Sequence, residues 1–208
     1  MCDYVTSRKS GVVLRQYAND IVKEVFRKVI HLCAAFIPIL LKYFYQPILI
    51  LLSSVLILYV IAEFLRYKGI NVPIFSVITQ TAARKRDENK FVLGPVTLTL
   101  GIIITALLFD YKSACVGIYA LALGDGLASL IGKIFGKTVL SFTQGKTAEG
   151  SLACFVAIFI SCFLVTKNAF SALIIALVGM FIELLPLKDF DNLLIPIILG
   201  FIMQYLLP

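Results

Sequence analysis

Long apolar runs that alternate with short polar connections constrain this chain more than any other feature. Seven such runs are present, hydrophobic residues make up 60% of the 208 residues, and the mean hydropathy is +0.97. Soluble domains have an apolar share of about 45–50%, so the composition predicts an all-α, polytopic integral membrane protein with about seven transmembrane helices. The predicted spans are residues 29–44, 47–65, 91–109, 113–132, 151–165, 169–185 and 193–206.

The N-terminal part of the chain differs from the rest. Residues 1–28 are polar and basic, with hydrophobic side chains at helical spacing towards their end, which predicts a cytoplasmic, interfacial helix and argues against a cleavable signal peptide. Residues 29–208 then form one transmembrane domain. The first span is shorter than the roughly 20 residues that cross a bilayer, and it contains Pro38. A kinked helix and a partly re-entrant helix are both open interpretations of it.

The distribution of basic residues predicts the orientation. Of the 19 lysines and arginines, only Lys42, Lys112 and Lys167 fall on one side of seven alternating spans, and the other sixteen fall on the opposite side. Short cytoplasmic loops are enriched in these residues, so we expect a multi-pass protein of the inner cell membrane with a cytoplasmic N-terminus. The net charge of +7 comes from blocks between apolar runs, which argues against nucleic acid as a partner.

A stretch rich in glycine and lysine, around the fourth and fifth spans, contains most of the predicted chemistry. Asp125 lies inside the fourth span, where a carboxylate costs roughly 2.5 to 3.5 kcal/mol on insertion scales, so it is a candidate functional group. A structural partnership with a lysine or a backbone amide is the alternative. The flanking Gly124 and Gly126 favour a site, because they leave space around the carboxylate. Lys133 and Lys146 suit an anionic ligand such as a nucleotide phosphate, against which Asp125 would hold Mg²⁺.

The start of the fifth span predicts an anion site. Its residues are Lys146, Thr147, Glu149, Gly150 and Ser151. The free amides and the positive dipole end of a helix favour bound anions at such a place. Capping of the helix by Thr147 is also predicted, and the two roles are compatible.

Two charged segments precede the early spans. Arg27, Lys28 and His31 fall on one helical face, where they predict phosphate or lipid-headgroup binding, although a snorkelling membrane anchor explains Arg27 and Lys28 equally well. For His31, a structural hydrogen-bonded role and a catalytic role are both open. The run from Arg84 to Glu88 is typical of a solvated face, with Glu88 as a second functional acid in the alternative interpretation.

A last polar group surrounds the short cytoplasmic turn before the seventh span. Glu183, Asp189, Asp191 and Asn192 place four oxygen-bearing side chains there. Such oxygens are the ligands that magnesium prefers. Helix capping by Asp191 or Asn192 is the alternative.

In their order and spacing, these residues resemble a known family. The pattern comprises Arg27-Lys28-x-x-His31, the charged segment 84–88 followed by Gly94, then Gly124-Asp125 with Gly132 and Gly136, Lys146-Thr147-x-Glu149-Gly150-Ser151, and Glu183 followed by Asp191-Asn192. It resembles the phytol kinase and dolichol kinase family, which also includes a CTP-dependent diacylglycerol kinase of yeasts and bacterial proteins described as phosphatidate cytidylyltransferase-like. The resemblance covers about residues 24–203.

The resemblance implies an enzyme that transfers the γ-phosphoryl group of CTP to a membrane alcohol, with Mg²⁺ or another divalent metal as cofactor. The alcohol would be a polyprenol, a phytol-like isoprenoid or a diacylglycerol. The implied catalytic residues are Asp125, Asp191 and Glu149, and the implied metal ligands are Asp125, Glu88 and Asp191. The implied nucleotide- and phosphate-binding residues are Lys28, Arg84, Lys133, Lys146, Thr147, Gly150 and Ser151. The remaining motif positions are Arg27, His31, Gly124, Glu183 and Asn192.

Two other functions are compatible with these motifs. A cytidylyltransferase would use the same nucleotide and metal site, but a lipid phosphate would attack the α-phosphorus and pyrophosphate would leave. A transporter or lipid-binding protein without chemistry would place its acids along a path through the bilayer, whereas the acids here cluster at one face. The pattern specifies no oligomeric state.

Overall fold

The computed structural model describes residues 21–70, 72–73, 79, 90–141, 143 and 145–206. Within these residues the structure is helical apart from its connections, and an isolated antiparallel bridge joins Val139 to Thr147. The predicted all-α class is confirmed. Two predicted site residues, Arg84 and Glu88, lie outside the described residues, as do residues 1–20.

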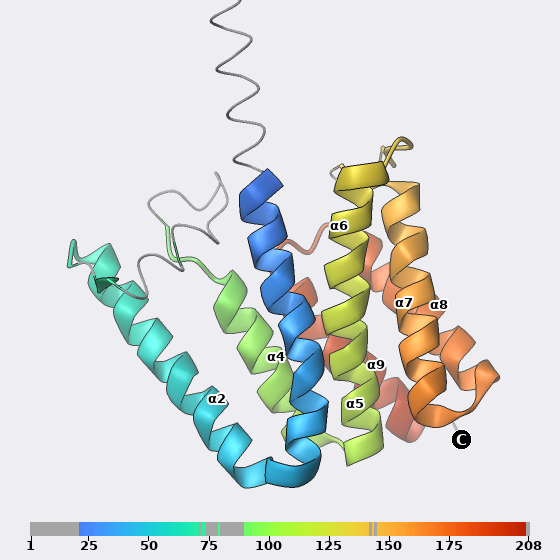
Figure 1. Ribbon diagram of the computed structural model, residues 1–208, viewed down its shortest axis with the longest axis horizontal. Coiled ribbons are helices and arrows are strands. Elements are labelled where there is room, and N and C mark those ends of the chain that lie inside the picture. Colours follow the sequence, from blue (N-terminus) through green and yellow to red (C-terminus); the bar gives the residue numbers. More distant parts are fainter. Residues whose placement is uncertain are drawn as a thin grey trace, which may run out of the picture.

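The N-terminal part of the fold is a helical hairpin. Residues 21–33 are helical without a break at residue 28, a 3₁₀ turn η1 (Ala34–Phe36) follows, and α2 (Ile37–Tyr67) continues the chain. Helix α2 has non-helical dihedrals at Phe44, with φ −135° and ψ 50°, shortly before Pro47. Proline within a helix removes a hydrogen bond and clashes with the preceding turn, which explains the kink. Figure 1 shows the chain running down before this bend and back up along α2.

Among the residues that the structure describes, six further helices and a π-helical turn follow. Helices α5 (Tyr111–Tyr119) and α6 (Gly126–Phe135) form one continuous rod through the π-helical turn η3 (Ala120–Asp125). The others are α4 (Gly94–Leu108), α7 (Ala148–Thr166), α8 (Ala169–Leu184) and α9 (Asp191–Tyr205). Helices α4, α7, α8 and α9 each coincide with one predicted apolar run apart from their first and last few residues. The α5–α6 rod coincides with the fourth run, whereas α2 contains the end of the first run and all of the second.

Helix α9 lies against α4 and α5 at the centre of the molecule, and α7 packs on α6 and α8. Two glycines allow the central helices to approach closely. A Cβ at Gly101 would lie 2.4 Å from the carbonyl oxygen of Asn192, and one at Gly117 would lie 2.3 Å from that of Pro196.

Three described helices are long and apolar enough to cross a membrane: Ile21–Tyr67, Tyr111–Phe135 and Ala148–Thr166. Helices α4, α8 and α9 are apolar but shorter. Many large hydrophobic side chains of the long helices remain exposed, such as Ile50 of α2 at 64% and Leu164 of α7 at 60%. Length, composition and exposed apolar surface together indicate an integral membrane protein.

Candidate functional site

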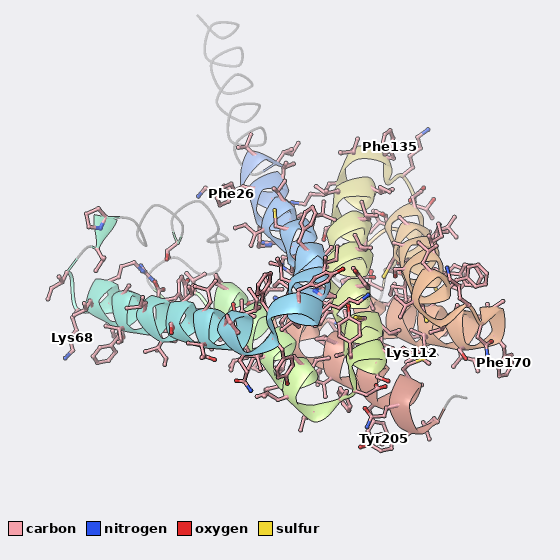
Figure 2. All side chains as sticks on the ribbon, turned by 60° about the horizontal axis from the view of Figure 1, so that its bottom comes forward. Phe26, Lys68, Lys112, Phe135, Phe170 and Tyr205 are labelled. Carbon is pink, nitrogen blue, oxygen red and sulfur yellow. The ribbon has the colours of Figure 1, made fainter. Side chains whose placement is uncertain are left out.

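A pocket of about 270 Å³ lies at one end of the helical bundle. Its walls come from the N-terminal helix, α6, the loop before α7, the start of α7, and the turn between α8 and α9. This is the end at which Phe26 and Phe135 lie in Figure 2, opposite to Lys112 and Tyr205. The pocket brings together ten residues predicted from the sequence: Arg27, Lys28, Asp125, Lys133, Lys146, Thr147, Gly150, Ser151, Glu183 and Asp191.

Asp125 is buried at the end of the π-helical turn, with 4% of its surface exposed. Lys28 Nζ donates to its Oδ2 at 2.5 Å, and His31 Nδ1 lies 3.1 Å from the same oxygen without making a hydrogen bond. Lys28 and His31 are each 3% exposed. Buried charges are stable only when paired, so the ammonium group of Lys28 neutralises the carboxylate. Both partners come from the helix that contained the predicted basic motif.

The glycines beside Asp125 have a different role from the one predicted. A Cβ at Gly124 would lie 2.7 Å from Ile158 of α7, and one at Gly126 would lie 3.0 Å from Leu32 of the N-terminal helix. These glycines therefore admit neighbouring helices instead of leaving space around the carboxylate, and that prediction was wrong. The π-helical turn, which the sequence did not predict, is the local irregularity at Asp125; such turns are frequent at functional sites.

Glu183 is a second buried acid of the pocket, with 5% of its surface exposed. Its Oε1 pairs with Lys146 Nζ at 3.0 Å, and Lys146 Nζ also lies 3.4 Å from the carbonyl oxygen of Leu185. Its Oε2 is buried and has no hydrogen-bond partner among the described residues. A buried carboxylate oxygen without a partner is costly. This atom is therefore the clearest vacant acceptor in the described pocket.

The loop before α7 and the first turn of α7 form another wall. Thr147 caps the helix, because its Oγ1 accepts a hydrogen bond from the Gly150 amide at 3.2 Å. The predicted cap is confirmed. The Ser151 hydroxyl donates to the carbonyl oxygen of Thr147 at 3.2 Å. A Cβ at Gly150 would lie 2.7 Å from the carbonyl oxygen of Ala128, so glycine at this position lets α7 approach α6 beside the pocket.

Two predicted site residues point elsewhere. The Glu149 carboxylate accepts from the Thr138 amide at 3.2 Å and does not line the pocket. Asn192 donates through Nδ2 to Thr97 Oγ1 at 3.3 Å, which links α9 to α4. Asp191, directly before it, does line the pocket and is 9% exposed. The predicted side-chain cap at the start of α9 is absent, since no side chain caps this helix.

Sequence reasoning missed Glu24. This residue lines the pocket and forms ion pairs with Arg27 and with Lys133, whose Nζ lies 3.2 Å from its Oε2. Its position in the sequence could have identified it. Separations of three, four and seven residues place it on the same helical face as Arg27, Lys28 and His31. Among the described residues, each predicted phosphate-binding base of the pocket is therefore joined to a carboxylate of the same pocket.

The oxygen donors of the pocket suit a hard cation. The described residues contain no group of three or more His, Cys, Asp or Glu side chains placed to hold a metal ion. Magnesium usually takes one or two carboxylates and completes its shell with water and substrate phosphates. One or two of the pocket's carboxylates, among Asp125, Asp191 and the unpartnered Oε2 of Glu183, would provide that smaller share.

The chain is similar to several known proteins. An uncharacterized protein of Methanocaldococcus jannaschii is 30% identical over 189 residues, which is 88% of this chain and 94% of that protein. Phytol kinase 1 of Arabidopsis thaliana is 25% identical over 91 residues, 42% of this chain and 30% of the kinase. Dolichol kinase of Saccharomyces cerevisiae is 31% identical over 122 residues, 57% of this chain and 22% of the kinase. No protein-family model and no solved structure matches the chain significantly.

Fold and site together define an all-α integral membrane protein with a pocket of paired charges at one end. The chain belongs to the same family as the archaeal protein, and it is a distant homologue of phytol kinases and dolichol kinase. The matched region spans less than a third of each of the two kinases named above.

Proposed function

We propose that the protein is a CTP-dependent kinase that phosphorylates a membrane lipid alcohol. The observation that carries this proposal is the pocket that brings Asp125 and Asp191 together with Lys28, Lys133 and Lys146 from distant parts of the chain. The distant homology to phytol and dolichol kinases supports the reaction class. A polyprenol, a phytol-like isoprenoid or a diacylglycerol is the proposed acceptor.

The proposed topology has seven spans, with the pocket at the cytoplasmic face. The kink at Phe44 supports it, because it divides the first candidate span into two antiparallel arms. The distribution of charge supports the orientation. Lys42 precedes the kink, Lys167 follows α7, and Lys112 is the second residue of α5. In Figure 1 the bend before α2 turns back, the α7–α8 connection and the start of α5 lie at the opposite end of the bundle from the end of α6 and the start of α7. Cytoplasmic loops are enriched in lysine and arginine, which assigns the pocket end, with its many bases, to the cytoplasm.

The residues of the pocket divide into two groups by charge. Lys28, Lys133 and Lys146 would bind phosphate oxygens of the nucleotide, and the amide groups of the first turn of α7 would add neutral donors. Asp125 would hold a magnesium ion, which when bound would neutralise charge on the phosphates. Phosphoryl transfer depends mainly on such positioning and neutralisation.

The reaction needs one further group that accepts a proton. The oxygen of the lipid hydroxyl forms a bond to the γ-phosphorus, the bond from that phosphorus to the β–γ bridging oxygen breaks, and CDP leaves with the electron pair. The hydroxyl proton passes to a carboxylate. Asp191 is proposed for this role, because Asp125 already has a cation on its Oδ2 whereas the described residues show no ion pair for Asp191.

A transfer assay tests the proposal. Purified protein in detergent is incubated with γ-labelled CTP, Mg²⁺ and, separately, diacylglycerol, phytol, farnesol and a polyprenol. We expect label in an organic-soluble product with one alcohol class. Formation of CDP-lipid from phosphatidate and α-labelled CTP, without transfer to any alcohol, would establish a cytidylyltransferase instead. Absence of both reactions would favour a membrane protein without chemistry.

A further inference from the structure

We infer that the pocket binds its metal ion and its polyphosphate by exchange of ion-pair partners, so that each of the two ligands requires the other. This inference rests on the proposed function, since it concerns the same pocket. It adds a property that the sequence motifs do not specify. Without ligands, the lysines and carboxylates of the pocket neutralise each other. They become available as ligands only when a metal ion and an anion bind together.

The first observation is the pairing of the bases. Lys28 is paired with Asp125, Lys146 with Glu183, and Lys133 with Glu24. A polyphosphate that arrives alone must detach a lysine from its carboxylate. That step leaves a buried carboxylate without a cation, which is strongly unfavourable. Metal-free polyphosphate is therefore expected to bind weakly, although the pocket is rich in lysine.

The second observation concerns the acids. No group of three metal-capable side chains exists among the described residues, so a metal ion that arrives alone finds too few protein ligands. It would also lie beside the ammonium group of Lys28, which is held at 2.5 Å from Asp125. The positive charges of the metal ion and of this ammonium group would repel each other. Metal without phosphate is therefore expected to bind weakly as well.

Both costs vanish when the two ligands bind together. The metal replaces the lysines as partner of the carboxylates, and the lysines turn to the phosphate oxygens. Lysine suits this exchange, because its ammonium group sits on a flexible four-carbon stem. The vacant Oε2 of Glu183 supplies an acceptor on the metal side without breaking any hydrogen bond. Two ligands that each favour the other are coupled, and typical couplings change affinity about 5–150-fold.

The test measures binding, without any lipid alcohol. Inorganic pyrophosphate and CTP are titrated into the purified protein by calorimetry, once with a metal chelator and once with Mg²⁺. In wild type we expect Mg²⁺ to tighten binding of both probes by at least about tenfold. Equal affinity with and without Mg²⁺ would overturn the inference.

A pair of variants separates partner exchange from simple charge. Glu183→Gln frees Lys146, so we expect it to tighten metal-free pyrophosphate binding at least about fivefold. Asp191→Asn removes the same charge from the same pocket but frees no lysine among the described residues, and we expect a change of less than about twofold. If both variants tighten binding equally, general repulsion is the cause. If Glu183→Gln leaves metal-free binding unchanged or weakens it, partner exchange is wrong.

Two further comparisons complete the design. Glu63→Gln alters a buried glutamate paired with Arg66 outside the pocket, and we expect the wild-type dependence on Mg²⁺. If Glu63→Gln lost the dependence of binding on Mg²⁺, the coupling would not be specific to the pocket, which would contradict the inference. Transfer activity with uncoupled binding would remove the inference and leave the kinase in place. Coupled binding of Mg²⁺ and polyphosphate without any transfer would contradict the proposed kinase function and leave the partner exchange in place.

Discussion

Two buried glutamates of this protein, Glu63 and Glu183, are alike in burial and differ in how they are satisfied. Glu63 is 1% exposed and pairs with Arg66, while Glu183 is 5% exposed and pairs with Lys146. Both oxygens of Glu63 have partners. Its Oε1 accepts from the Val92 amide at 2.8 Å and from Arg66 at 2.6 Å, and its Oε2 accepts from Arg66 at 2.9 Å.

Glu183 uses only one of its oxygens. Its partner lies 37 positions earlier in the sequence, whereas Arg66 is one helical turn from Glu63. A fully satisfied acid with a local partner serves the fold: Glu63 fastens α2 to the segment before α4. An acid with a vacant oxygen that lines a pocket has capacity left for a ligand. Burial and charge alone thus do not separate these two acids, whereas the unused acceptor of Glu183 does.

The largest expected effect is on transfer activity, which should depend far more on the pocket residue Asp125 than on Glu63. Replacing Asp125 with asparagine removes the carboxylate at the centre of the pocket, and we expect transfer to fall on the order of a thousandfold, the scale of losing one group that stabilises transition-state charge. Glu63→Gln should retain activity within about tenfold. Initial rates with γ-labelled CTP check both variants, at matched membrane insertion. Full activity of Asp125→Asn would refute the proposed mechanism.

For stability we expect the larger loss from the variant outside the pocket. Glu63→Gln breaks a buried ion pair and removes an acceptor from the Val92 amide, so we expect a loss of about 3 kcal/mol, at the low end for such pairs because Arg66 is partly solvated. Glu183→Gln should cost less than about 1 kcal/mol, because it also removes a buried charge with an unsatisfied oxygen. Thermal unfolding in detergent compares them. An equal loss in both variants would contradict the distinction drawn above.

The pair of Lys28 and Asp125 provides a smaller, more specific test. Each single variant, Lys28→Met or Asp125→Asn, leaves a buried polar group without its partner, whereas the double variant leaves neither charge. We therefore expect the double variant to be more stable than the sum of the single losses predicts, with a coupling of about 1–3 kcal/mol. Unfolding midpoints of the three variants give the cycle. Additive losses would show that the two side chains do not interact in solution.

Much of the fold was predictable because its signals are local. Apolar runs located the helices, Pro47 explains the kink after which α2 turns back, and the threonine at position 147 capped α7 as its chemistry suggests. The candidate site was predictable as a set of residues, since ten of them line one pocket. The π-helical turn at Asp125 was not predicted, because no residue type marks it.

The identity of each partner within the site was not predictable, although a lysine partner for Asp125 was one of the two interpretations of the sequence. Lys28 was compatible with a membrane anchor or a phosphate ligand, and its actual partner lies 97 positions away. One sequence contains no signal for such a pair, because it depends on how two helices pack. Gly124 was misjudged for the same reason, since the side chain that it accommodates, Ile158, belongs to a distant helix.

The smallest expected effect concerns Glu149, which belongs to the sequence motif but lies outside the pocket lining. Its carboxylate is fully engaged with the Thr138 amide, at 3.2 and 3.3 Å for its two oxygens. Glutamine retains one acceptor oxygen, so Glu149→Gln should leave transfer rates within about threefold, because it only weakens one exposed hydrogen bond outside the pocket. Rates are compared with those of Glu183→Gln under the same conditions. A hundredfold loss would place Glu149 among the catalytic residues and would mean that motif membership predicts the site better than the pocket does.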